Sequence, residues 1–274
     1  MTADWVDTLE RIIQLEKTEI DIVDSLLKHL YKDKKYSIEK IKEKNNIEMP
    51  DFIIKDDINT YLIELKEKRD DEKLVKTREG ELKQGNMFFS KTSQGRINTI
   101  SSIIEKGYNQ LKNISENKID FKLLFFSAEG YDAKSQIAQL RATIYGIKDI
   151  IDKNNKNEMA KPCFYFDFND FYRFADTLDG VIWVNSIESK AQFCINSFSP
   201  EYEKIKNSLI YRSFEEGICD PYEEEKNNRG YIADCDYDRR NEKEILDYID
   251  TKYKKKFIPF SFNKVTATQI IPKQ

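Results

Sequence analysis

The sequence predicts an α/β protein in which helices flank one mixed central sheet. Residues 3–31 carry apolar side chains at intervals of three and four, which is typical of an amphipathic helix. Two short strand-like stretches follow within residues 50–66, with turn-forming residues between them. From residue 96 onward, helix-like and strand-like segments alternate, and this alternation favours an α/β arrangement around one sheet.

The composition narrows the class of protein before any motif is considered. The chain has 274 residues, is 39% hydrophobic and has a net charge of −4, so a large core is expected and no general affinity for nucleic acid is indicated. Its four cysteines form no C-x-x-C pair and His29 is its only histidine, which argues against a Cys/His zinc site.

The same features predict where the protein is found. We interpret the cysteines as reduced thiols of a cytoplasmic protein. The first residues lack the basic segment of a signal peptide. Because no apolar run approaches the ~18 residues of a membrane span, we expect no membrane partner.

The elements are expected in the following order. The helix 3–31 carries Glu16 and Glu19 on or beside its apolar stripe, and residues 32–48 form a short charged helix or a loop. The remaining expected elements are the hairpin 50–66, a long loop 67–95, a helix 96–113 mildly interrupted by Gly107, a strand 121–127, a helix 132–153, a strand 163–168, and a hairpin or edge strands at 180–186 and 191–197.

Three polar side chains on the hairpin form the candidate site. Asp51 opens its first strand, while Glu64 and Lys66 close its second strand and, two positions apart, point to one face. An antiparallel hairpin brings these two ends together. Two neighbouring carboxylates repel each other unless a cation lies between them, and Mg²⁺ or Mn²⁺ accepts such ligands together with phosphate oxygens. With Lys66 beside the nucleophile, the set is suited to metal-assisted phosphodiester hydrolysis.

Pro50-Asp51, twelve intervening residues and Glu64-Leu65-Lys66 resemble the motif of the PD-(D/E)xK nuclease superfamily. The resemblance implies a restriction-endonuclease-like core with the order helix, motif hairpin, helix, strand. It implies that Asp51 and Glu64 bind the metal and that Lys66 acts on the attacking water. Many members add a metal ligand from the first helix, for which Glu19 is the candidate and Glu16 the rival. The family is also known for a Gln or Tyr on the following helix, where Tyr108 and Gln110 lie.

The chain is expected to divide into a nuclease-like core, 1–170, and a C-terminal extension, 171–274, packed on the core. The extension has an acidic segment, 215–250, and a basic tail, 251–274. Basic residues in and beside the long loop are candidate nucleic-acid contacts: Lys83, Lys91 and Arg96. Three basic residues spaced by seven are expected on the outer face of the helix 132–153: Lys134, Arg141 and Lys148.

The expected function is that of a Mg²⁺-dependent nuclease, with DNA favoured over RNA and with restriction or antiviral defence as the setting that the family implies. The alternative is a catalytically inactive module of the same fold that binds nucleic acid or a protein partner. Many nucleases that cut duplexes act as dimers, so a homodimer or a partner subunit stays open. The chain lacks both the P-loop and the dinucleotide-binding glycine patterns, which disfavours an enzyme of either class.

Overall fold

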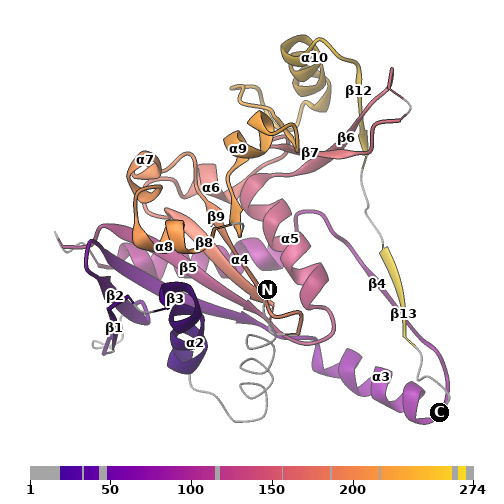
Figure 1. The fold of residues 1–274 in the computed structure, drawn as a ribbon. Helices are drawn as coiled ribbons and strands as arrows, with labels where there is room; N and C mark the ends of the chain where they lie inside the picture. The colour runs from indigo at the N-terminus through magenta and orange to yellow at the C-terminus, as the bar shows by residue number, and fades with distance from the viewer. Residues whose placement is uncertain are drawn as a thin grey trace.

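A computed structural model describes residues 19–32, 34–42, 48–114, 118–155, 157–185, 187–215, 217–260 and 265–269. Its centre is a seven-stranded mixed sheet with the order β1-β2-β3-β5-β8-β9-β10 (Figure 1). The strands are β1 (Tyr36–Lys40), β2 (Phe52–Asp56), β3 (Thr60–Lys68), β5 (Phe121–Ala128), β8 (Gly180–Asn185), β9 (Lys190–Ile195) and β10 (Ile218–Cys219).

Both kinds of strand pairing occur in this sheet. Strands β1, β2 and β3 pair in antiparallel fashion, β3, β5 and β8 run parallel, and β9 returns antiparallel to β8. The central strand β5 is buried at all but one of its positions. This near-continuous burial is expected of a strand that is covered on both faces.

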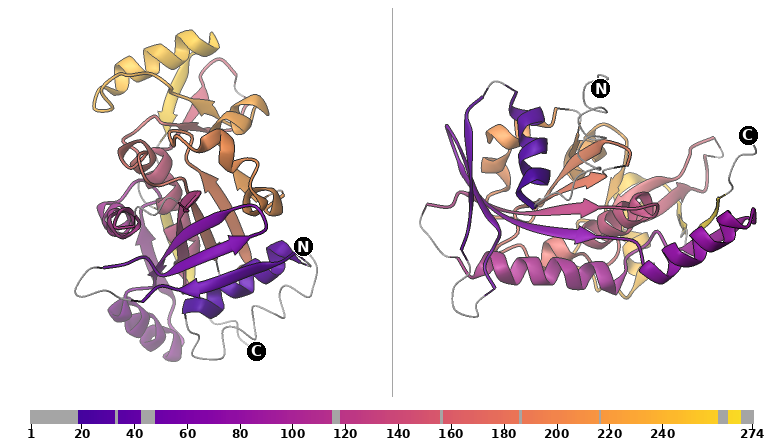
Figure 2. Two further views of the ribbon diagram at one scale, coloured as in Figure 1. Left: turned by 90° about the vertical axis from the view of Figure 1, so that its left-hand side faces the viewer. Right: turned by 90° about the horizontal axis from the view of Figure 1, so that it is seen from below.

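Helices cover the two faces of the sheet. The helices α2 (Glu19–Tyr31), α7 (Tyr202–Ile205) and α8 (Leu209–Ser213) pack on one face, and α4 (Asn98–Lys112) and α5 (Ala133–Tyr145) pack on the other (Figure 2). Along β3, Ile63 and Leu65 join the core under α2, while Leu62 joins the core under α4. Because side chains alternate along a strand, Glu64 and Lys66 lie on the α4 side.

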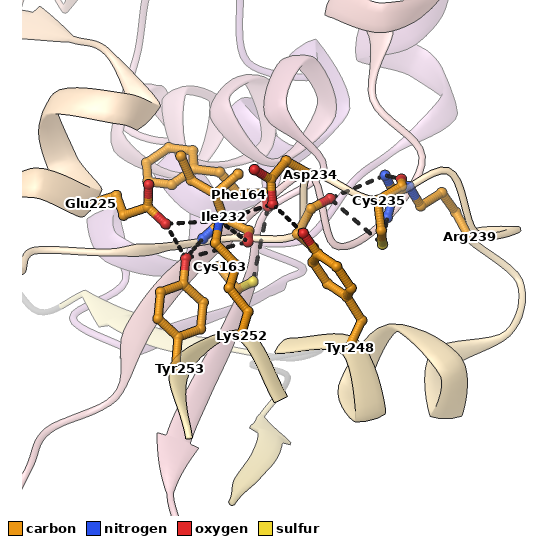
Figure 3. Close-up of polar contacts among 11 residues, drawn as sticks. Cys163, Phe164, Glu225, Ile232, Asp234, Cys235, Arg239, Tyr248, Lys252 and Tyr253 are labelled. Carbon is orange, nitrogen blue, oxygen red and sulfur yellow. Dashed lines mark hydrogen bonds and ion pairs between the residues drawn. The ribbon is translucent and has the colours of Figure 1, made fainter. Parts of the chain in front are cut away.

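A second, four-stranded sheet has the order β11-β7-β6-β12. Its strands are β6 (Lys148–Asp152), β7 (Lys161–Phe164), β11 (Tyr231–Ile232) and β12 (Phe257–Phe260). The helices α9 (Pro221–Lys226) and α10 (Glu242–Tyr253) lie beside this sheet, and the short helix α6 (Asp170–Arg173) lies in the connection from β7 to β8. The Lys252 ammonium of α10 forms ion pairs with the carboxylates of Glu225 at 2.9 Å and Asp234 at 2.8 Å (Figure 3). Part of the acidic segment 215–250 is therefore neutralised within the fold.

An arm projects from the first sheet. It consists of α3 (Glu72–Lys83) and a two-stranded antiparallel ribbon of β4 (Phe88–Thr92) and β13 (Val265–Gln269) (Figure 1). At its base, the Asp70 carboxylate accepts hydrogen bonds from the backbone N–H groups of Tyr131 and Asp132 at 2.7 and 3.1 Å, and pairs with Arg78 at 3.7 Å. These contacts fasten the arm to the turn between β5 and α5.

The structure confirms the mixed α/β architecture, the hairpin, the helix 96–113 and the strand 121–127. The segments 180–186 and 191–197 form the antiparallel pair β8–β9 within the main sheet. The first part of the expected helix 3–31, including Glu16, lies outside the described residues.

Four expectations about the elements were wrong. The strand expected at 163–168 spans Lys161–Phe164 (β7) and pairs with β6 and β11 in the second sheet. Residues 36–40 form the edge strand β1 instead of a charged helix or loop, because their backbone pairs with β2. The expected loop 67–95 contains the end of β3, the helix α3 and the strand β4. The helix 132–153 ends at Tyr145, because Gly146 adopts the left-handed φ of 59° and the chain continues as β6.

The main sheet includes strands on both sides of residue 170, the position at which the sequence predicts the end of the core. Strands β8 and β9 extend it beyond β5, while β11 and β12 join β6 and β7 in the second sheet. In the described part of the chain, no helix has the length and apolar character needed to cross a membrane.

Candidate active site

The hairpin brings the three motif residues together as its register requires. Phe52 pairs with Ile63, so Asp51 lies one step beyond the paired part of β2, beside the second half of β3. The Asp51 backbone N–H donates to the carbonyl of Ile63 at 3.1 Å, and its carboxylate accepts from the backbone N–H of Leu65 at 2.7 Å. The side chain of Asp51 is thereby held against the strand that carries Glu64 and Lys66.

Glu64 is a buried carboxyl group in the middle of the sheet. Only 1% of the residue is exposed, and its neighbour on the parallel strand β5 is Leu124. One carboxyl oxygen, Oε1, accepts a hydrogen bond from Lys66 Nζ. The other oxygen, Oε2, is buried and has no hydrogen-bond donor among the described residues. A buried acceptor without a partner costs free energy, so its retention here calls for a ligand or a proton.

Lys66 is positioned by the helix on the same face. Its Nζ donates a hydrogen bond to Oε1 of Gln110 at 2.6 Å, and the Gln110 amide Nε2 donates to the carbonyl of Met49 at 3.1 Å. Gln110 thus connects the lysine to the segment just before Asp51. Tyr108, the other candidate on this helix, points elsewhere, because its hydroxyl donates to Asp176 at 3.2 Å and its ring stacks on Phe174.

Gly107 allows α4 to approach β3 this closely. A Cβ atom at this position would lie 2.5 Å from Leu124 Cδ1, 3.4 Å from Glu64 Cγ and 3.7 Å from Lys66 Cε. The helix is continuous through Gly107, which corrects the expected interruption. The glycine therefore allows α4 to pack closely over the candidate site. Gly107 lies three residues before Gln110 and hence on the same side of the helix, and this spacing could have indicated that Gln110 faces Lys66.

The electrostatics of the cluster are set mainly by burial. Burial raises the pKa of the Glu64 carboxyl to about 8; the hydrogen bond from Lys66 opposes this rise, and the neighbouring charge of Asp51 adds to it. Burial also raises the pKa of Asp51, while the Leu65 N–H group counteracts this effect. Two interacting carboxyl groups with raised pKa values are a recognised property of functional sites.

Glu19 lies at the start of α2, and its charge contributes to the raised pKa of Asp51. Its carboxylate is half-exposed and pairs with Lys40 at 3.1 Å. No set of three or more His, Cys, Asp or Glu side chains with the arrangement of a metal site occurs within the described ranges. Asp51 and Glu64 nevertheless suit a hard cation, because they provide adjacent carboxylates and Glu64 Oε2 accepts no hydrogen bond from the described residues.

The three candidate nucleic-acid contacts do not form one group. Lys83 is exposed at the end of α3, and Lys91 is exposed on β4, both on the arm. Arg96 is folded back onto the start of α4, where it pairs with Asp170 at 3.3 Å and bonds Ser101 at 3.1 Å. Arg96 is thus partly buried in an ion pair, while the two lysines are accessible.

Comparison of the chain with models of protein families, with curated proteins and with solved structures finds no match in any of the three. A functional assignment therefore depends on the geometry and chemistry of the chain's own residues.

Proposed function

We propose that this chain is a Mg²⁺-dependent nuclease that hydrolyses phosphodiester bonds, with DNA as the favoured substrate. The observation that carries the proposal is the buried Glu64 carboxyl beside Asp51 and Lys66, one oxygen of which meets no donor in the described part of the chain. An ordinary outward-facing glutamate of a strand would be exposed instead. A carboxyl that is retained in the core at this cost is a strong candidate for a functional group.

The order of elements supports the finer fold proposal. Helix α2 precedes the hairpin β2–β3, helix α4 follows it along the chain, and β5 then pairs parallel to β3. This is the order that resemblance to the PD-(D/E)xK superfamily implies. The helix α3 and strand β4 would then be an insertion between the hairpin and α4.

In this proposal Asp51 and Glu64 hold the cation. When bound, Mg²⁺ would stabilise the charge that develops on the phosphate and lower the pKa of a water molecule. The Lys66 ammonium has three N–H donors, of which Glu64 and Gln110 each accept one. The third is available to hold a phosphate oxygen or the attacking water, and Gln110 keeps the ammonium aimed at that place.

Glu64 also links the proposed activity to pH. Because its pKa is raised to about 8, the carboxyl holds a proton in most molecules at pH 7. Binding of a cation requires the ionised form, so the proton must leave when the cation enters. We therefore expect the affinity for Mg²⁺ to increase as the pH rises from 6 to 8.

The proposal is tested by comparing Glu64→Gln with the matched control Glu67→Gln. Glu67 lies on the same strand, three positions after Glu64, and its side chain therefore points to the other face of the sheet. It forms an ion pair with Arg69 at 2.9 Å. Plasmid, linear single-stranded DNA and RNA are incubated with Mg²⁺ or with EDTA. Cleavage should require Mg²⁺, disappear in Glu64→Gln and persist in Glu67→Gln.

Titration calorimetry should show Mg²⁺ binding to the wild type and a loss of at least tenfold in affinity in Glu64→Gln. Undiminished cleavage by Glu64→Gln would refute the proposal.

One observation favours the alternative of a catalytically inactive module. Lys66 is engaged by two side chains, and no third acid joins Asp51 and Glu64 among the described residues. In that case the three side chains stabilise the hairpin, and the arm with Lys83 and Lys91 binds a partner. This alternative predicts binding of nucleic acid in EDTA, no Mg²⁺-dependent turnover and no change in binding in Glu64→Gln.

A further inference from the structure

A second polar site lies away from the motif residues. A pocket of about 490 Å³ is formed between the loop before α4, helix α5 and the second sheet. Its polar and aromatic walls include Arg96, Arg141, Lys148, Asp149, Asp167 and Phe260. None of Asp51, Glu64 or Lys66 lines it. The volume is within the range of roughly 300–1,000 Å³ that is usual for small-molecule sites.

Arg141 is the least compensated charge in this pocket. The sequence places it on the outer face of its helix, but the structure directs it inward from α5. The one hydrogen-bond acceptor found for it in the described chain is the Cys219 thiol, with Nη2 and Sγ 3.8 Å apart. Within the described ranges, its buried Nε has no acceptor and no carboxylate pairs with the guanidinium. A thiol is a weak acceptor, so the guanidinium retains most of its capacity to bind an anion.

Two further cations reach the pocket from other elements. Arg96 comes from the loop before α4 and pairs with Asp170 at 3.3 Å, while its buried Nε also has no acceptor in the parts of the chain that the structure describes. Lys148 opens β6 and pairs with Glu242 at 3.3 Å. Burial raises the pKa values of Asp149 and Asp167. The charge of Arg141 opposes the rise at Asp149, and the charges of Lys148 and Arg96 oppose it at Asp167. The cations and the two acids therefore share one electrostatic environment.

The walls of the pocket differ in character. Phe260, Pro162 and Ile147 provide an apolar side, and the Asp167 carboxylate provides a hydrogen-bond acceptor. Guanidinium groups bind phosphate oxygens in a two-pronged geometry, and aromatic rings stack on planar bases. A ligand with a phosphate, a planar ring and amino donors would match all three kinds of wall.

We propose that this pocket binds a phosphate monoester of mononucleotide size, with its phosphate at Arg141 and Arg96 and its base on the side of Phe260. This inference does not depend on the proposed nuclease activity. The pocket would bind the ligand through side chains, since the chain lacks the glycine-rich phosphate loops of common nucleotide-binding folds. It also gives Arg96 a role other than contact with a long nucleic acid.

The test measures binding of adenosine 5′-monophosphate, adenosine and inorganic phosphate to the full chain by titration calorimetry in EDTA. We expect saturable binding of the monophosphate, at least tenfold weaker binding of inorganic phosphate and no binding of adenosine. Absence of saturable binding of the monophosphate would overturn the proposal. Equal binding of adenosine would exclude the role of the phosphate, and equal binding of inorganic phosphate would exclude the role of the apolar wall.

Three variants locate the site. Arg141→Gln should weaken binding of the monophosphate at least tenfold, whereas Asp149→Asn should tighten it severalfold, because an acid that faces Arg141 is removed. The matched control is Lys134→Gln on α5, whose side chain is 82% exposed and pairs with Glu188 at 3.8 Å; its affinity should equal that of the wild type. Asp149→Asn keeps the test decisive if Arg141→Gln fails to fold. Unchanged affinity in a folded Asp149→Asn protein would place the ligand elsewhere.

Discussion

The buried carboxyl of Glu64 predicts a specific pH dependence of stability in the metal-free protein. Its pKa is raised from 4.5 to about 8, so the folded chain holds a proton that the unfolded chain releases between these pH values. The stabilisation by this proton is fully present below pH 4.5 and is lost as the pH rises through about 8. At about 1.4 kcal/mol per pH unit, the loss amounts to about 5 kcal/mol for the interval that the two pKa values define.

The perturbation is Glu64→Gln, which keeps the shape of the side chain and removes the ionisation. The assay is urea unfolding in EDTA at intervals from pH 5 to pH 8.5, with the wild type and the variant measured in parallel. Asp179, whose pKa is raised to about 6, also titrates in this range, but it is present in both proteins and cancels in the difference. The variant should gain several kcal/mol over the wild type as the pH rises. Parallel curves across the whole range would refute the account of Glu64 as a buried, proton-holding group.

Three further predictions concern packing and support. Gly107→Ala should destabilise the fold by about 1 kcal/mol in urea unfolding, because the cost of overpacking against Leu124 (about 1–3 kcal/mol) exceeds the gain in helix propensity (about 1 kcal/mol). The control is Gly80→Ala in α3, which should stabilise the fold because an added Cβ meets nothing within 4 Å. Equal effects of the two substitutions would contradict the close approach of α4. Gln110→Leu should reduce nuclease turnover about tenfold with Mg²⁺ affinity in calorimetry unchanged, whereas Tyr108→Phe should leave turnover intact. Asp70→Ala should cost roughly 3–5 kcal/mol of unfolding free energy because it leaves Arg78 buried without its partner, and a loss below 1 kcal/mol would show that the pair is not buried in solution.

The motif hairpin was predictable because its information is local. Two short runs of β-branched and aromatic residues flank a tight turn, and the register of such a hairpin fixes which ends meet. The convergence of Asp51, Glu64 and Lys66 follows from that register and from the alternation of side chains along β3. The continuous apolar run of β5 was likewise predictable, since a strand buried on both faces needs no polar alternation.

The arm was not predictable, because distant parts of the chain stabilise it. Strand β4 pairs with β13, more than 170 positions later, and Asp70 just before α3 accepts hydrogen bonds from the backbone N–H groups of Tyr131 and Asp132 in the turn after β5. Locally, residues 67–95 are polar and contain three glycines, so their propensity indicates a loop. The choice of Gln110 over Tyr108 was open for the same reason, because it depends on the close packing of α4 that Gly107 permits.

The pairing of β5 with β8 has a practical consequence for producing the protein. A chain shortened to residue 170 would lose β8, and the backbone groups of β5 that now pair with Gly180–Asn185 would be left open along a hydrophobic central strand. Such an edge offers a template for pairing with other chains, so the fragment should accumulate as insoluble aggregate when expressed. A soluble truncated form that keeps the main sheet whole would have to extend at least to Cys219, the end of β10.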